Sequence, residues 1–291
     1  MSEVDIAHLR TWIGRTESKS DVLTPGLVER LRATIGDIAP GGADDAPLAI
    51  HWCLAPPAVP PGELGPDGHP ARGGFLPPVP LPRRMWAGGE LHFHEPLRVG
   101  DTLTRTSKIA DVTEKQGRSG HLVFVAVDHE ITTSSGVVAI TERQDIVYRD
   151  PPAGPAAKPA AAPNTEMPAP EWRHFVEATS TLLFRYSALT FNGHRIHYDL
   201  EYARDVEGYA GLVVHGPLQA TLLLNLAARL GGERPVRSFR YRGVSPLFAG
   251  AAFSANAAAN GDGFKLWCAD RHGAVTMEAK AGFGRDHAPG R

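Results

Sequence analysis

The chain has 291 residues, with 30 Lys and Arg against 32 Asp and Glu and a formal net charge of −2. This length favours two domains, or one composite domain, over a single small core. The balanced charge, with no basic run longer than Arg83-Arg84, argues against nucleic acid or an anionic membrane as a partner. No apolar stretch reaches the roughly 18 residues that a membrane-spanning helix needs.

The two cysteines, Cys53 and Cys268, are too few for a disulfide framework and lack metal-ligand spacing. Their number favours a reducing compartment. The segment Met1–Arg10 carries Glu3 and Asp5 and has no long apolar core, so it does not resemble a secretory signal. We therefore expect a cytoplasmic protein that uses no metal ion or other cofactor.

The first clear element in chain order is a helix that begins at Thr24-Pro25, an N-cap followed by a proline. Leu27, Val28, Leu31 and Ile35 keep helical spacing, and Gly36 can end the helix. A long Pro- and Gly-rich segment, residues 56–82, follows. We expect it to be an ordered excursion over the surface or over the mouth of an active site, since loops of this length are functional or disordered.

A weak internal repeat relates the two halves of the chain. Pro-Leu-x-x-Gly occurs at Pro96–Gly100 and again at Pro246–Gly250, an offset of 246 − 96 = 150 residues. Three apolar segments separated by turn residues follow each copy, which predicts matched strands. These strands are predicted at residues 103–112, 121–132 and 137–148, and at 251–259, 264–269 and 274–283.

A Pro- and Ala-rich segment, residues 150–170, separates the halves and is typical of a semi-rigid linker. In the second half, Pro217 to Leu230 is apolar nearly all round, which predicts a buried helix. One buried helix wrapped by a curved antiparallel sheet is the hot-dog architecture. We therefore predict an α+β double hot-dog fold with its two sheets side by side, comprising residues 1–149, a linker at 150–170, and residues 171–291.

The densest cluster of chemically capable side chains is Asn192, His194, His197 and Asp199, all within eight positions. It is followed by His215-Gly216 directly before the buried helix. A glycine N–H at a helix start can hold a carbonyl oxygen or oxyanion, because free donors and the helix dipole converge there.

Residues 190–199, Thr-Phe-Asn-Gly-His-Arg-Ile-His-Tyr-Asp, and 214–216, Val-His-Gly, resemble the hydratase motif of the MaoC-like, R-specific enoyl-CoA hydratase family without gaps. They resemble more closely a two-domain branch with Asn at the acid position. That branch includes mitochondrial 3-hydroxyacyl-thioester dehydratases and the mesaconyl-CoA and itaconyl-CoA hydratases. The resemblance implies a hydro-lyase that reversibly hydrates a short branched or dicarboxylic enoyl-CoA thioester, such as mesaconyl-CoA or itaconyl-CoA, to a citramalyl-CoA type of product.

The family's catalytic aspartate aligns with Asn192, whose amide cannot take a proton but can orient a water. The resemblance and the chemistry therefore assign Asn192 to the water, His197 to proton transfer and Gly216 to the thioester carbonyl. Asp199 either orients an imidazole or caps a helix at residues 200–203, and N-cap preference favours the cap.

Five further residues are candidates for substrate binding, each with a structural alternative. His194 and Arg195 replace the family's Asn-Pro and either support the fold or bind a substrate carboxylate. His215 is a hydrogen-bonding residue beside Gly216 or a proton carrier. Arg240 and Arg242 share a strand face and are solvated charges or contacts for CoA phosphates. His92 and His94 also share a face, but without an Asp or Cys partner at suitable spacing we expect no metal there.

Two other functions compete with the hydratase. A hot-dog thioesterase would need a carboxylate on the buried helix, and residues 218–230 contain none. The asparagine at position 192 motivates a catalytically inactive acyl-CoA-binding protein, against which His197 and Gly216 argue. Because the first half lacks the Asn-x-x-x-x-His frame, we expect it to shape the acyl pocket without a catalytic role, and we expect a homodimer.

Overall fold

The computed structural model describes residues 4–40, 46–117, 120–150 and 167–284. Most of the predicted linker, residues 151–166, lies outside this part of the chain. The helices are α1 (Ile6–Arg10), α2 (Pro25–Ile35), α3 (Ser180–Thr190) and α4 (Gly216–Gly231), with short turns at η1 (Gly36–Ile38), η2 (Ile50–Cys53), η3 (Pro61–Glu63), η4 (Arg195–His197) and the π-helical η5 (Tyr202–Val206). The strands are β1 (Thr16–Val22), β2 (Arg83–Phe93), β3 (Thr102–Gly117), β4 (Gly120–Thr133), β5 (Val138–Arg149), β6 (Trp172–Glu177), β7 (Val236–Gly243), β8 (Ala252–Asn260), β9 (Gly263–Ala269) and β10 (Val275–Phe283).

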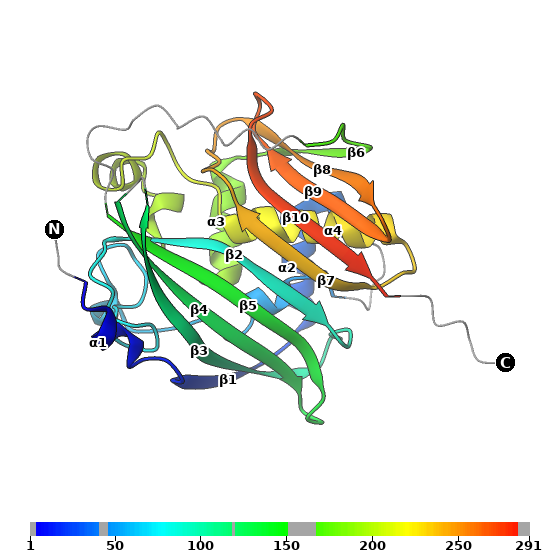
Figure 1. The fold of residues 1–291 in the computed structure, drawn as a ribbon. Helices are drawn as coiled ribbons and strands as arrows, with labels where there is room; N and C mark the ends of the chain where they lie inside the picture. Colours follow the sequence, from blue (N-terminus) through cyan, green and yellow to red (C-terminus); the bar gives the residue numbers. More distant parts are fainter. Residues whose placement is uncertain (1–3, 41–45, 118–119, 151–166, 285–291) are drawn as a thin grey trace.

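All ten of these strands join one antiparallel sheet in the order β1-β3-β4-β5-β2-β7-β10-β9-β8-β6. The first five belong to the first half of the chain and the last five to the second, so the two predicted sheets lie side by side (Figure 1). The six strands predicted after the Pro-Leu-x-x-Gly repeats correspond to β3, β4, β5, β8, β9 and β10. Their alternation explains why they form, since Val123, Val125 and Val127 share one buried face of β4.

The seam between the halves is the β2–β7 ladder, which pairs Gly88 with Arg242 and His92 with Ser238. A Cβ at Gly89 would lie 2.3 Å from the Tyr241 hydroxyl and 2.4 Å from the Arg143 carbonyl oxygen. Such distances are far below normal contact, so this position accepts only glycine. The seam is therefore a continuous, closely packed part of the sheet.

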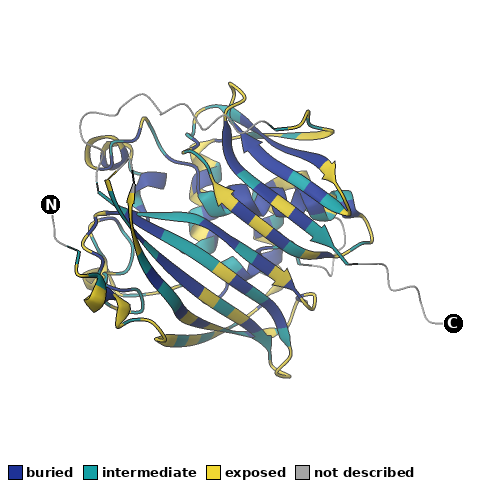
Figure 2. Ribbon diagram, in the orientation of Figure 1, coloured by how far each residue is buried: buried dark blue, intermediate teal, exposed yellow. Residues whose placement is uncertain are grey.

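The helices lie against one face of this sheet, and the halves differ in how fully they bury theirs (Figure 2). In α4 eleven of sixteen residues are buried, in keeping with its apolar sequence. In α2 only Leu27, Val28, Leu31 and Ile35 are buried, and Thr24 caps its N-terminus by accepting from the Leu27 N–H. Both helix predictions are confirmed, and the site described below lies at the N-terminal end of α4.

Within the described residues, no helix combines the length and hydropathy that crossing a membrane requires.

Candidate active site

A sharp turn after α3 positions Asn192. Phe191 adopts the left-handed conformation with φ of 50°, and the Asn192 N–H donates to the Ser187 carbonyl at 2.9 Å. The Asn192 Oδ1 then accepts from the His194 N–H at 2.9 Å. Because Oδ1 is occupied, the Nδ2 group is the part of this amide that remains available as a donor.

His197 is buried, and a single backbone contact orients its ring. Its Nδ1–H donates to the Val213 carbonyl at 2.7 Å, which leaves the lone pair on Nε2. Nε2 has no hydrogen-bond partner among the described residues. Burial, and then the neighbouring rings of His215 and His194, lower the pKa of His197 well below its usual value. The neutral imidazole is therefore a free acceptor at neutral pH.

His215 stacks on His197 with ring centroids 3.6 Å apart. A 2.8 Å hydrogen bond joins its Nε2 to the Ser187 hydroxyl, while its Nδ1 is buried with no partner in the described structure. Burial lowers the pKa of His215 to about 3. His215 therefore bonds to Ser187 of α3 on one side and stacks on His197 on the other. These contacts favour the hydrogen-bonding role over that of a proton carrier.

Gly216 is the first residue of α4, where backbone N–H groups have no acceptor within the helix. A Cβ at this position would lie 3.2 Å from the Trp86 ring of β2. Among the described residues the Gly216 N–H has no acceptor, so the N-terminus of α4 presents a donor beside the Trp86 ring from the other half of the molecule.

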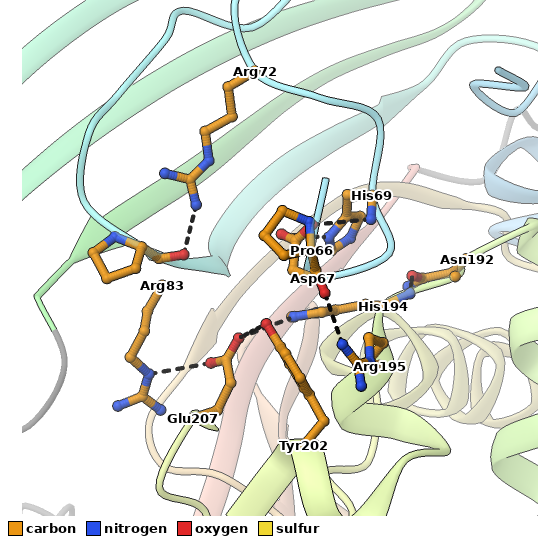
Figure 3. A network of polar contacts seen from close by, with 12 residues as sticks. Pro66, Asp67, His69, Arg72, Arg83, Asn192, His194, Arg195, Tyr202 and Glu207 are labelled. Atoms are coloured by element: carbon orange, nitrogen blue, oxygen red, sulfur yellow. Dashed lines mark hydrogen bonds and ion pairs between the residues drawn. The ribbon is translucent and has the colours of Figure 1, made fainter. Parts of the chain in front are cut away.

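His194 connects the motif to a buried ionic network (Figure 3). Its Nε2 lies 3.5 Å from Glu207 Oε1, and its ring lies 5.5 Å from that of His197. Glu207 also pairs with Arg83 at 3.3 Å and accepts from the Tyr202 hydroxyl at 3.4 Å. This network holds His194 beside the motif.

Arg195 and Asp199 bond to each other. Asp199 Oδ2 accepts from Arg195 Nε at 3.0 Å and from Nη2 at 2.8 Å, while Oδ1 accepts from the Tyr202 N–H at 3.0 Å. The capping role of Asp199 is therefore confirmed, although the segment after residue 201 is a π-helix and not a continuation of the α-turn. The Arg195 guanidinium is committed to Asp199 and to the Pro66 carbonyl, which favours its structural alternative.

The first half supplies side chains that sequence reasoning missed. A turn in the long Pro- and Gly-rich segment packs directly on the motif, with the Arg195 N–H donating to the Asp67 carbonyl at 2.9 Å. A Cβ at Gly68 would lie 2.0 Å from the Gly193 carbonyl oxygen, so the two backbones touch. Of the two alternatives for this segment, these contacts favour the one in which it covers the motif. The first half therefore contributes polar groups beside the motif.

His69 from this turn lies against His194, with ring centroids 4.3 Å apart (Figure 3). Asp67 Oδ1 accepts from the His69 N–H at 3.0 Å, and Oδ2 lies 3.2 Å from His69 Nδ1. Asp67, His69 and His194 offer ligand atoms within 4.8 Å of one another, a cluster that could hold a metal ion and that the sequence did not suggest. Both oxygens of Asp67 are already engaged by His69.

Arg240 and Arg242 are exposed residues of β7 and alternate with the buried Phe239 and Tyr241. They therefore lie on the sheet face opposite to α4 and to the motif. Arg242 pairs with Glu278 at 2.6 Å, and Arg240 lies 3.7 Å from Glu90. The structure does not bring these arginines to the site, and it favours the alternative of solvated charges.

A groove of about 560 Å³ between α2 and α3 is lined by Leu27, Phe184, Leu189 and Phe191 among others. This volume falls in the range of small-molecule sites. None of the motif's polar residues lines the groove, which ends on the α3 side at Phe191, next to Asn192. The chemistry of the site therefore rests on the motif itself.

Comparisons with known proteins agree with this geometry. The family model for hydroxyacyl-thioester dehydratase type 2 matches residues 49–249. The mesaconyl-C(4)-CoA hydratase of Chloroflexus aurantiacus is 44% identical over 290 residues, covering 96% of this chain and 99% of that protein. The mitochondrial hydroxyacyl-thioester dehydratase type 2 of Saccharomyces cerevisiae is 28% identical over 221 residues, covering 71% and 75%.

Solved structures share the fold. A MaoC-like dehydratase from Phytophthora capsici superposes with a TM-score of 0.70 at 16% identity, covering 99% of this chain and all of that one. HtdX of Mycobacterium tuberculosis gives a TM-score of 0.66 at 19% identity, covering 93% and 100%. A further M. tuberculosis protein described as a double hot-dog fold gives 0.54 at 15% identity, covering 92% and 95%. The chain therefore belongs to the hydroxyacyl-thioester dehydratase type 2 family, and it is a hydro-lyase with a double hot-dog fold.

Proposed function

We propose that the protein reversibly hydrates the CoA thioester of a short, branched, dicarboxylic enoic acid. Mesaconyl-CoA is the leading substrate and a citramalyl-CoA type of thioester the product, with itaconyl-CoA as the second candidate. The similarity to the mesaconyl-C(4)-CoA hydratase, at 44% identity over nearly the full length of both chains, supports this choice.

The observation that carries the proposal is the state of His197. Its Nδ1–H is held by the Val213 carbonyl, so the neutral ring directs an unpartnered Nε2 lone pair away from the backbone. A general base for water needs this form, and burial keeps the ring neutral. The site therefore has a proton acceptor even though Asn192 cannot serve as one.

Each of three residues has one role in the hydration. The Gly216 N–H and the α4 dipole hold the thioester carbonyl oxygen, where negative charge develops. The Asn192 Nδ2 group donates to the attacking water. His197 Nε2 takes a proton from that water as its oxygen bonds to the β-carbon, and the π electrons move toward the thioester. The protonated His197 then returns the proton to the α-carbon, and dehydration is the reverse.

A thioesterase remains the alternative enzyme for comparison. The buried polar side chains of α4 are Gln219, Thr221 and Asn225, and none is a carboxylate that could activate water at the carbonyl carbon. Gln219 is also engaged by the Thr276 hydroxyl at 2.7 Å. These contacts favour addition of water to the double bond over cleavage of the thioester.

The test is a panel of enoyl-CoA esters followed at the enoyl-thioester absorbance band and with a thiol reagent. We expect loss of absorbance without thiol release, fastest with mesaconyl-CoA. His197→Ala should abolish turnover. The matched control is His92→Ala, because His92 is exposed on β2 and, among the described residues, forms an ion pair with Glu90 alone, at 3.3 Å. Release of free CoA at the rate of absorbance loss would identify a thioesterase, and no change in either signal would identify an inactive binding protein.

We also propose that the protein is a cytoplasmic homodimer, since symmetric pairing is the commonest oligomeric arrangement. Light scattering that gives a mass near that of one 31.2 kDa chain would contradict the dimer.

A further inference from the structure

Most arginines near the motif are already occupied by partners. Arg83 is buried and pairs with Glu207 at 3.3 Å, and Arg195 pairs with Asp199. Arg72 donates to the carbonyl oxygens of Val79, Leu81 and Pro82. These three guanidinium groups stabilise the protein and have little capacity left for a ligand.

Arg84 differs from them. It is half-buried on β2, and it forms no ion pair with any carboxylate of the described residues. Its strand partner on β5 is Tyr148, whose side chain is fully buried. Paired residues of an antiparallel ladder project to the same face, so Arg84 projects to the inner, concave side of the sheet. Its charge interacts with the Tyr148 hydroxyl and with the Asp67 carboxylate, but without an ion pair, so the guanidinium keeps donors for a ligand anion.

The position of Arg84 relative to the reaction follows from the strand. Trp86, two residues along β2, projects to the same face and lies against Gly216, the donor assigned to the thioester carbonyl. Two residues of a strand span about 7 Å. In a four-carbon enedioic thioester the free carboxylate is attached to the β-carbon, three bonds from the thioester carbon. This separation is shorter than the spacing along β2, and the long arginine side chain can cover the difference.

The charge of Arg84 also interacts with residues of the turn that packs on the motif. Its charge, after burial, helps to lower the pKa of His69 to about 3. The same charge, with the hydrogen bonds from His69, holds the pKa of Asp67 below its usual range although burial opposes this. His69 is in ring contact with His194 of the motif. The guanidinium is therefore close to the turn that packs on the hydratase motif.

We propose that Arg84 is the anchor for the free carboxylate of a dicarboxylic acyl-thioester substrate, in a subsite closed by the Asp67–His69 turn. The proposal rests on the hydratase function and adds to it the residue that selects a second carboxylate. A bidentate contact of this kind specifies both charge and orientation, which a simple cation does not. The two halves of the molecule then share the substrate, with the thioester at α4 and the carboxylate at β2.

The test compares mesaconyl-CoA with crotonyl-CoA, which has the enoyl thioester but no second carboxylate. Arg84→Gln should lower kcat/KM for mesaconyl-CoA by about 10- to 100-fold, the loss of one charge-assisted hydrogen bond, and leave that for crotonyl-CoA unchanged or raised. Arg84→Lys should give an intermediate loss, because it keeps the charge without the planar fork. The matched control is Arg143→Gln in β5, whose side chain is half-exposed and pairs with Asp145 at 3.1 Å. It should affect neither substrate.

Equal losses for the two substrates in Arg84→Gln would overturn the proposal and assign the residue to the fold. Loss of mesaconyl-CoA turnover on chelation, with recovery on adding Zn²⁺, would overturn it in favour of a metal ion at Asp67, His69 and His194. If the wild-type protein hydrates neither ester, the proposed function fails. Calorimetric binding then still decides the subsite, because only a carboxylate anchor makes Arg84→Gln weaken mesaconyl-CoA and spare crotonyl-CoA.

Discussion

Replacing Gly68 with alanine should separate the turn of the first half from the hydratase motif. Gly68 has φ of +87°, a conformation that costs an alanine about 1–2 kcal/mol. In addition, the new Cβ would lie 2.0 Å from the Gly193 carbonyl oxygen. An ordinary contact is about 3.5 Å, so the two backbones must separate by more than about 1 Å.

This displacement breaks the contacts that hold the turn against the site. It removes the Arg195 N–H to Asp67 hydrogen bond of 2.9 Å and moves His69 away from His194. A misplacement of about 1 Å near the reacting groups costs about 100-fold in rate. We therefore expect kcat/KM for mesaconyl-CoA to fall about 100-fold in Gly68→Ala, with a loss of about 1–3 kcal/mol in the free energy of unfolding.

The matched control is Gly73→Ala in the same segment. Gly73 has φ of +91°, but the nearest atom to its new Cβ is Pro78 Cβ at 3.6 Å, an ordinary contact. This variant has the conformational cost without the clash, so stability should fall by about 1 kcal/mol while kcat/KM stays near wild type. Steady-state kinetics and urea unfolding of both variants measure the difference. Equal activities of Gly68→Ala and Gly73→Ala would refute the role that we assign to the docked turn.

Two further predictions concern the motif. Asn192→Asp removes the Nδ2 donor and adds a negative charge beside a carboxylate-bearing substrate. KM for mesaconyl-CoA should therefore rise more than kcat falls, and added salt should reduce the rise in KM. An Asn192→Ala variant with wild-type kcat/KM would show that the chemistry lies elsewhere. The lowered pKa values of His197 and His215 make stability fall in acid, because below about pH 6.5 the unfolded chain binds protons that the folded chain does not. Each ring contributes up to about 1.4 kcal/mol per pH unit, so the two rings should account for a loss of about 2.7 kcal/mol between pH 7.5 and pH 5.5 in urea unfolding, to which His69 adds about half as much. Stability that is flat over this window would mean that the two rings bind protons as readily in the folded protein as in the unfolded chain.

The elements with strong local signals could be predicted from the sequence. The strands of both halves alternate apolar and polar residues between clear turns, and the helix at Pro25–Ile35 has a cap, a proline and a closing glycine. The buried helix α4 was evident from its apolar residues on every side. In these segments the local pattern and the tertiary environment agree.

The missed parts of the site depend on contacts between distant segments. Asp67 and His69 lie in a segment without periodicity, and only its docking on Gly193 gives them a place beside the motif. The Pro-Asp-Gly-His sequence of residues 66–69 signals a turn, which was the one local clue that this segment is ordered. For Arg240 and Arg242 the sequence showed a shared face but could not say which face of the sheet it was.

The pairing of β2 with β7 joins two hot-dog halves of different sequence within one chain. Two identical chains that associate in the same way would have to carry every substitution twice, once in each copy. In the present chain the gene encodes the copies separately, so a change at Arg84 or Asp67 leaves the counterpart position in the second half untouched. One copy can thus keep the reaction machinery while the other changes to fit a new acyl group, and selectivity can evolve without risk to the proton-transfer residues.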